Sequence, residues 1–481
     1  MTKIKKMLSN PICFLFAVNV IVLLVSVFVF HPFFEENDDA FLAMLAEGAY
    51  GMREDHLIYV NAVLGKLLTG VYGLIPGIRW YSILQYLFLF AAYCIMTYLL
   101  GVQRKRPLLS FLLLLGTFYE TYVSLQYTKT AAVVTAAGYL LLFEIVRIKK
   151  EIGRFPRLFF LPAYTLLLYG ALLRGSAFLL ASIPMLFVGL YEWHCFYRKE
   201  ERKEFVKVFV PVFCVVALLF AADHMAYEND AEWKTFLAYN NTRMELLDYR
   251  YDLLDYSANG RQLEELGISE NDALLYLTWQ FGDDRVVTTE FMNNILDHAN
   301  ARSVDTKMLK EFLSHLFEEF YSLNALLPCL LGAVLLFLTA FSLKDGESRK
   351  KKGLFLYFAG NVFAVFLILF YYQYSGRWNH RVVYALLMTV LFAFFYEGAF
   401  CYDGQKEKVR AEMIIFAIAL FFNIGLLLQN QFDYRSYLRT ELDSKAQTAL
   451  MQKEKEQLFV IDTFTFQNAY KYDVFTAYLP G

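Results

Sequence analysis

Eleven separate apolar segments, each close to the length of a membrane-spanning helix, constrain this chain more than any other feature. The first, from Pro11 to Phe30, carries no charged side chain and is long enough to cross the hydrocarbon core of a bilayer. Hydrophobic residues make up 58% of the 481 residues and charged residues only 19%, which differs from the composition of soluble domains. The sequence therefore predicts an all-α protein that crosses a membrane many times. The predicted spans are residues 11–31, 80–100, 107–124, 130–146, 158–173, 176–195, 205–222, 323–342, 354–374, 381–400 and 411–429.

The short loops between these spans carry clusters of basic residues, such as Arg104–Arg106 and Arg349–Lys352. If there are eleven spans, all six basic clusters fall on one side, which the positive-inside rule assigns to the cytoplasm. The N-terminus is then inside and the C-terminus outside. Residues 58–78 are also apolar, but a span there would move Arg104–Arg106 outside. We therefore interpret them as an amphipathic helix at the outer surface, within an external loop over 32–79.

The loop lengths predict four regions. Residues 1–222 hold seven spans and residues 323–429 hold four. Between them, residues 223–322 carry about twenty acidic and eight basic side chains, and we expect an acidic external subdomain built of helices. Its segment Ser269–Asp272 has the pattern of a capping box that begins a helix. The external tail, 430–481, is expected to form a helix over 434–457 and a strand-like piece over 458–464.

A group of carboxylates, Glu35-Glu36-Asn37-Asp38-Asp39, directly follows the first span. Glu36 and Asp38 are spaced so that both could hold one divalent cation, such as Mg²⁺ or Mn²⁺. Asp38 or Asp39 could instead act as a general base. The alternative is that these residues form only the acidic N-terminus of a helix over 40–50, where negative charge is favoured.

Glu120 lies among aromatic residues at the outer end of the third predicted span. A lone carboxylate near the bilayer is costly unless it is paired or functional, so Glu120 is a second candidate catalytic residue. Lys129, nine residues further along the chain, is its expected partner if the role of Glu120 is structural.

Four further residues place basic groups on the external side: Arg174, Arg377, His380 and Arg381. Arg174 could lie at the membrane interface with its charged group extended into water, which would need no ligand. The other three lie in one short loop and run against the positive-inside bias, which a bound phosphate or pyrophosphate would explain. We therefore consider these four residues, with Lys129 and Glu36, as candidate substrate-binding groups.

Several kinds of chemistry lack their usual motifs. The six cysteines form no C-x-x-C pair, and the histidines lack the spacing of zinc ligands. There is no glycine-rich phosphate loop and no nucleophile elbow, so we expect neither a nucleotide site nor nucleic acid as a partner. An activated donor delivered through the membrane remains the expected reactant.

The arrangement of an external acidic motif, Glu36-x-Asp38 or Asp38-Asp39, after the first span resembles that of C-type (GT-C) membrane glycosyltransferases. About eleven spans and an external C-terminal segment add to this resemblance, which is strongest over residues 1–195. The strings Arg243–Tyr249 and Gly267–Asp272 look similar to uncharacterised polytopic proteins of Gram-positive bacteria. The mid-chain acidic segment is a departure from the family pattern.

The resemblance implies a polyprenyl-phosphate-linked sugar as donor and a glycan, lipid or protein of the cell envelope as acceptor, at the bacterial plasma membrane. Asp38 or Asp39 would be the acidic catalytic residue, Glu120 a second one, and Lys129, Arg174 and Arg377 would contact the lipid phosphate. Two alternatives are a polysaccharide polymerase or ligase that depends on Arg377 and His380, and a non-catalytic transporter or scaffold.

Overall fold

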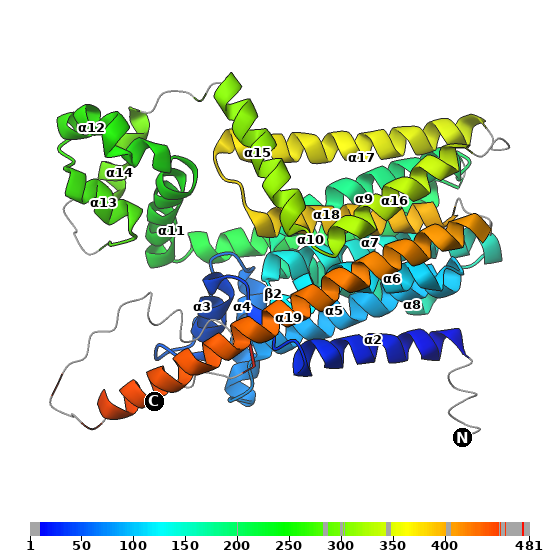
Figure 1. Ribbon diagram of the computed structural model, residues 1–481, viewed down its shortest axis with the longest axis horizontal. Coiled ribbons are helices and arrows are strands. Elements are labelled where there is room, and N and C mark those ends of the chain that lie inside the picture. The colour runs from blue at the N-terminus through cyan, green and yellow to red at the C-terminus, as the bar shows by residue number, and fades with distance from the viewer. Residues whose placement is uncertain are drawn as a thin grey trace. The chain divides into compact units, whose positions relative to one another are not determined.

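The computed structural model describes residues 10–199, 201–281, 287–298, 302, 304–342, 348–400, 406–451, 453, 457 and 474–475. Within these residues the chain is almost entirely helical (Figure 1). The helices are α2 (Pro11–Phe28), α3 (Asn37–Glu47), α4 (Ala62–Leu74), α5 (Trp80–Tyr98), α6 (Pro107–Phe118), α7 (Tyr127–Ile152), α8 (Arg157–Leu173), α9 (Gly175–Cys195), α10 (Lys203–Glu228), α11 (Ala231–Met244), α12 (Tyr256–Glu265), α13 (Glu270–Leu277), α14 (Thr289–Asp297), α15 (Thr306–Ser322), α16 (Leu326–Ser342), α17 (Ser348–Ser375), α18 (His380–Phe400) and α19 (Lys406–Met451).

Eight helices are long and apolar enough to cross a membrane, counted over the described residues. They correspond to α2, α5, α7, α9, α10, α17, α18 and α19. Helices α4, α6, α8 and α16 are shorter but also apolar. Each of the eleven predicted spans therefore coincides with a helix, and the chain is a multi-pass, all-α membrane protein.

Two predicted helices have different ends in the structure. The amphipathic helix expected over 58–78 is α4 (Ala62–Leu74), whose first turn is capped by the Asn61 side chain. The last span and the tail helix over 434–457 are one continuous helix, α19 (Lys406–Met451), because no proline or capping glycine interrupts the chain there. The strand expected over 458–464 lies outside the described residues.

Contact clustering divides the chain into two compact units. The first comprises residues 1–220, 321–364 and 381–481, and the second comprises residues 221–320 and 365–380. In the first unit, helix α7 is the central element and is almost completely buried. Gly170 of α8 lets this helix pack closely against α7. A Cβ atom at Gly170 would lie only 2.2 Å from Oγ1 of Thr135 in α7, which is too close for a side chain.

Two short segments of the first unit pair as parallel strands, β1 (Phe33–Phe34) and β2 (Ser124–Leu125). The backbone N–H of Glu35 extends this pairing by donating to the carbonyl oxygen of Leu125 at 3.1 Å. The pairing fixes the acidic residues after α2 beside the connection between α6 and α7. Near the C-terminus, Val474 is buried and Phe475 stacks on Tyr86 at 5.3 Å between ring centroids.

The second unit has a small hydrophobic core of its own. Buried residues from α11 to α14 form it, among them Leu254, Leu263, Tyr276 and Met292. Helix α13 begins with a capping box in which Ser269 and Asp272 each bond the other's backbone N–H, as the sequence predicted.

Candidate active site

Asp39 is fully buried at the start of α3, where three groups of the first unit bind its carboxyl group. The Tyr81 hydroxyl donates to Oδ1 at 2.9 Å, and the Gln85 amide donates to the same atom at 3.4 Å. The backbone N–H of Tyr127, at the N-terminus of α7, lies 3.2 Å from Oδ1. The pKa of Asp39 is raised to about 8, mainly by burial and to a lesser extent by the charge of Asp38, against the lowering effect of the Tyr81 hydrogen bond. Asp39 therefore links α3 to α5 and α7.

Asp38 lies in a different environment from its neighbour. About one third of its side chain is exposed, and Oδ2 lies 3.0 Å from Nη1 of Arg381. The Glu36 carboxylate lies 4.0 Å from the same nitrogen and is more exposed. Arg381 thus contacts both acidic residues of the E-x-D motif, and Asp38 is the partly exposed carboxylate of the adjacent pair Asp38 and Asp39.

Lys129 is a fully buried cation between two carboxylates. Its ammonium nitrogen lies 2.8 Å from Glu35 and 2.8 Å from Glu120. It also lies 3.4 Å from the Ser124 hydroxyl and 5.8 Å from the centre of the Tyr384 ring. Both carboxylates therefore serve as counter-ions to Lys129, and Glu120 has the ion pair that its spacing from Lys129 suggested.

Arg174 joins this group of residues through Tyr127. Its guanidinium donates to the Tyr127 hydroxyl and lies over the rings of Tyr59 at 4.5 Å and Tyr127 at 4.7 Å. No described carboxylate forms an ion pair with Arg174. Its Nε–H also donates to the Ser176 hydroxyl at 3.2 Å. The guanidinium keeps its charge, and its other N–H groups can bind a further anion.

Arg377 and His380 belong to the second unit and have partners there. Arg377 forms an ion pair with Asp248 at 3.1 Å and lies 5.1 Å from the centre of the Tyr249 ring. His380 Nδ1 lies 2.5 Å from a carboxylate oxygen of Glu319. Their positions are thus explained by contacts within that unit.

The residues expected to hold a divalent cation, Glu36 and Asp38, face a guanidinium. Because Arg381 supplies the positive charge between them, this arrangement does not fit a metal site. A second group, Glu54, Asp55 and His56, could offer three ligand atoms to a cation. There the His56 ring already lies 2.7 Å from Asp55 and 3.3 Å from Glu54.

Sequence reasoning missed several residues of the site. Tyr81, Gln85 and Tyr127 contact Asp39, but tyrosine is common throughout this chain and nothing in the sequence singles these three out. Glu35 was noted only as part of the acidic group. The β1–β2 pairing brings Glu35 close to Lys129. Strands of only two residues have no recognisable sequence pattern, so this pairing could not be predicted.

A second network of buried charges was also missed, at the opposite end of α7. Arg147 lies 2.5 Å from Glu192 and 3.0 Å from Glu397. Arg104 lies 2.7 Å from Glu144, whose carboxylate also accepts from the Tyr396 hydroxyl. These residues lie near the ends of predicted spans, and they are paired across α7, α9, α18 and the connection between α5 and α6.

Comparisons with known proteins give no relative for this chain. No protein-family model matches it. No curated protein and no solved structure is significantly similar to it either. The geometry of the site is therefore the basis for a functional proposal.

Proposed function

We propose that this protein is a membrane glycosyltransferase of the GT-C type that transfers a sugar from a polyprenyl-phosphate-linked donor to a cell-envelope acceptor. The reaction would take place at the outer face of a bacterial plasma membrane. One observation carries the proposal: a partly exposed carboxylate, Asp38, lies against Arg381 in the same end of the helix bundle as Lys129 and Arg174.

In the proposed reaction, Asp38 is the general base. It accepts the proton of an acceptor hydroxyl, and the acceptor oxygen forms a bond to the anomeric carbon of the donor. The bond between that carbon and the phosphate oxygen breaks, and polyprenyl phosphate leaves. Arg381 and Arg174 stabilise the negative charge that develops on the phosphate.

Asp39, Lys129 and Glu120 would act as positioning residues. Asp39 is fully buried and fixes the start of α3 against α5 and α7. Lys129 is neutralised by Glu35 and Glu120, so it orders the segment that carries Asp38. No metal is assigned to the reaction, because Arg381 lies where a cation between Glu36 and Asp38 would have to bind.

The proposed topology is eleven spans with the N-terminus inside and the C-terminus outside. The ion pairs of the first unit support it. Arg104, Arg106 and Arg147 meet carboxylates of α7, α9, α18 and α19 near the basic loops. The Asp38, Lys129 and Arg174 contacts gather at the other helix ends, as expected if successive spans alternate in direction.

The test is a comparison of lipid extracts from cells that contain or lack this protein. Loss of a transferase should cause its polyprenyl-phosphate-linked sugar to accumulate. The wild-type protein and the control variant Asp433→Asn, which changes an exposed carboxylate of α19, should restore the normal level. Asp38→Asn should not restore it, although the variant is inserted in the membrane.

Three results would contradict this function. The first is an Asp38→Asn protein that restores the normal lipid pattern. The second is loss of function in an Arg377→Gln, His380→Gln variant with no loss in Asp38→Asn, which would favour a polymerase or ligase. The absence of any accumulated donor in the deletion strain would favour a transporter or scaffold.

A further inference from the structure

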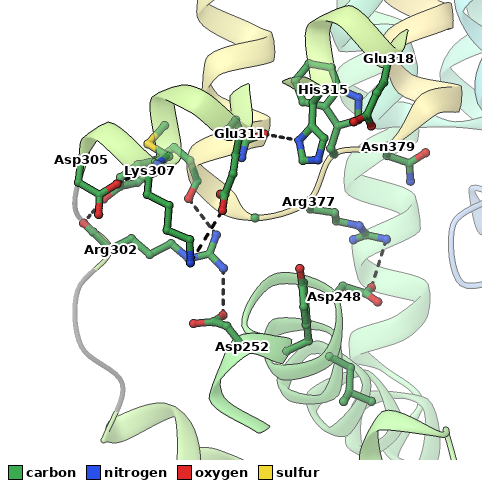
Figure 2. Close-up of a pocket in the computed structure, with 17 residues that line it drawn as sticks. Asp248, Asp252, Arg302, Asp305, Lys307, Glu311, His315, Glu318, Arg377 and Asn379 are labelled. Carbon is green, nitrogen blue, oxygen red and sulfur yellow. Dashed lines mark hydrogen bonds and ion pairs between the residues drawn. The ribbon is translucent and has the colours of Figure 1, made fainter. Parts of the chain in front are cut away.

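The second unit contains a cavity of about 1080 Å³, which is as large as the pockets that hold small ligands. Figure 2 shows that three segments enclose it. These are the turn over 247–252, helix α15 (Thr306–Ser322) together with Arg302 and Asp305 before it, and residues 373–379 at the end of α17. All the lining residues belong to the second unit.

The arginines of this cavity are already engaged by protein groups. Arg302 lies 3.2 Å from the Asp252 carboxylate and donates to the carbonyl oxygen of Tyr374 at 2.9 Å. Arg377 lies 3.1 Å from Asp248. Figure 2 shows these pairs as bridges between the segments. They order the walls of the cavity and leave little positive charge for an anionic ligand.

The lining carries an excess of carboxylates. Five acidic and three cationic side chains give a net charge of −2 when His315 is neutral. Asp305 and Glu318 form no ion pair with any described residue. Their carboxylates accept only from nearby groups, the backbone N–H of Met308 at 2.8 Å and the Ser314 hydroxyl at 3.1 Å. Both retain lone pairs that can accept further hydrogen bonds.

Aromatic rings complete the lining. Tyr251 is 56% exposed and Tyr374 is 39% exposed, so their ring surfaces are available to a ligand. Trp378 is held in place by Phe312 and by its indole N–H, which donates to Glu319 at 3.0 Å. Exposed rings beside carboxylates suit a ligand that has both an apolar face and hydrogen-bond donors.

We propose that this cavity binds a glycan that carries free, protonated amino groups. Carboxylates accept hydrogen bonds from hydroxyl and ammonium groups, and ammonium groups are attracted to aromatic ring faces. The C–H face of a sugar ring can pack on Tyr251 or Tyr374. An anionic glycan fits poorly because of the net negative charge and the occupied arginines. This binding does not depend on the transfer reaction proposed above.

The test uses the purified full-length protein in detergent and isothermal titration calorimetry. The probe is a tetramer of glucosamine, at mildly acidic pH where its amines are protonated. We expect the glucosamine tetramer to bind. The N-acetylated tetramer should bind more weakly by about tenfold or more, because its amide groups cannot form charged hydrogen bonds to the carboxylates. The double variant Asp305→Asn, Glu318→Gln should weaken binding of the glucosamine tetramer by a similar factor. Asn at 305 keeps the helix cap.

A matched control removes the same charge elsewhere in the unit. Glu232→Gln, Glu290→Gln changes two exposed carboxylates outside the cavity and should leave the affinity unchanged. Tyr251→Ala should also weaken binding, and it tests the cavity without altering its charge. Absence of binding, equal affinity for both tetramers, or equal weakening by the control double variant would overturn the proposal.

Discussion

The Asp38 carboxylate lies 3.0 Å from a guanidinium nitrogen of Arg381, a residue 343 positions away in the sequence. We expect Asp38→Asn to reduce sugar transfer by about 10²–10⁴-fold, as loss of a general base does. Arg381→Lys keeps the positive charge but loses the planar guanidinium with its several N–H donors, so it should also lower the rate of transfer. Both effects can be measured as the rate at which membrane extracts transfer a labelled sugar.

The control for this prediction is Asp433→Asn, which should transfer sugar at the wild-type rate. Thermal unfolding of the purified variants shows whether each is folded. An Asp38→Asn protein that unfolds at the wild-type temperature and retains full activity would mean that the acidic group only begins helix α3.

The pKa of Asp39, raised by burial to about 8 from 3.8, makes stability depend on pH. Between these pH values the folded protein retains a proton that the unfolded chain has lost. Its stability should therefore fall as the pH rises from about 4 to about 8. Asp39→Asn removes this titration. The melting temperature of the variant relative to wild type should increase with pH over that range and then level off.

Asp433→Asn again serves as the comparison, because an exposed carboxylate should leave the pH profile parallel to that of wild type. A constant difference in melting temperature between Asp39→Asn and wild type would show that Asp39 does not titrate in this range.

Lys129 is fully buried between Glu35 and Glu120, so its loss should be strongly destabilising. Lys129→Met leaves two carboxylates without their cation, which costs on the order of 3–5 kcal/mol. Adding Glu120→Gln removes one of these charges, so the double variant should lose less stability than the sum of the two single variants. Thermal unfolding of the four proteins gives the coupling energy. Strictly additive losses would show that the pair does not interact.

Reporter fusions test the orientation of the spans. A fusion after Lys351 should report the cytoplasm, and a fusion after Tyr434 should report the exterior. Lys351 lies in the predicted cytoplasmic loop before the span 354–374, and Tyr434 lies in α19 beyond the last predicted span. If both fusions report the same side, eleven spans with an inside N-terminus is wrong.

The helices themselves could be predicted well from the sequence, because an apolar run of about twenty residues has few alternatives in a membrane. The capping box at Ser269 and Asp272 was predictable for a similar reason, since its pattern is local. The Glu120–Lys129 pair was also within reach, because nine residues and one turn separate the two side chains.

The rest of the site depends on contacts that no local pattern reveals. Arg381 meets Asp38, and Arg147 meets Glu397, only after distant helices pack together. The different roles of Asp38 and Asp39 depend on which carboxylate faces Tyr81, and adjacent residues in a helix differ in direction by about 100°. A shift of one residue in the start of α3 would place Asp38, and not Asp39, beside Tyr81.

The two charged layers on α7 have a consequence for the membrane voltage. Lys129 and Glu144 are 15 residues apart, about 22 Å along a helix, whereas the hydrocarbon core of a bilayer is about 30 Å thick. The surrounding helices shield these charges from lipid, so polar groups reach deeper here than they could in the bilayer itself. Each ion pair holds opposite charges at nearly the same depth, so the two charges nearly cancel in the membrane potential. Loss of one partner from either layer would leave a charge on which that potential acts.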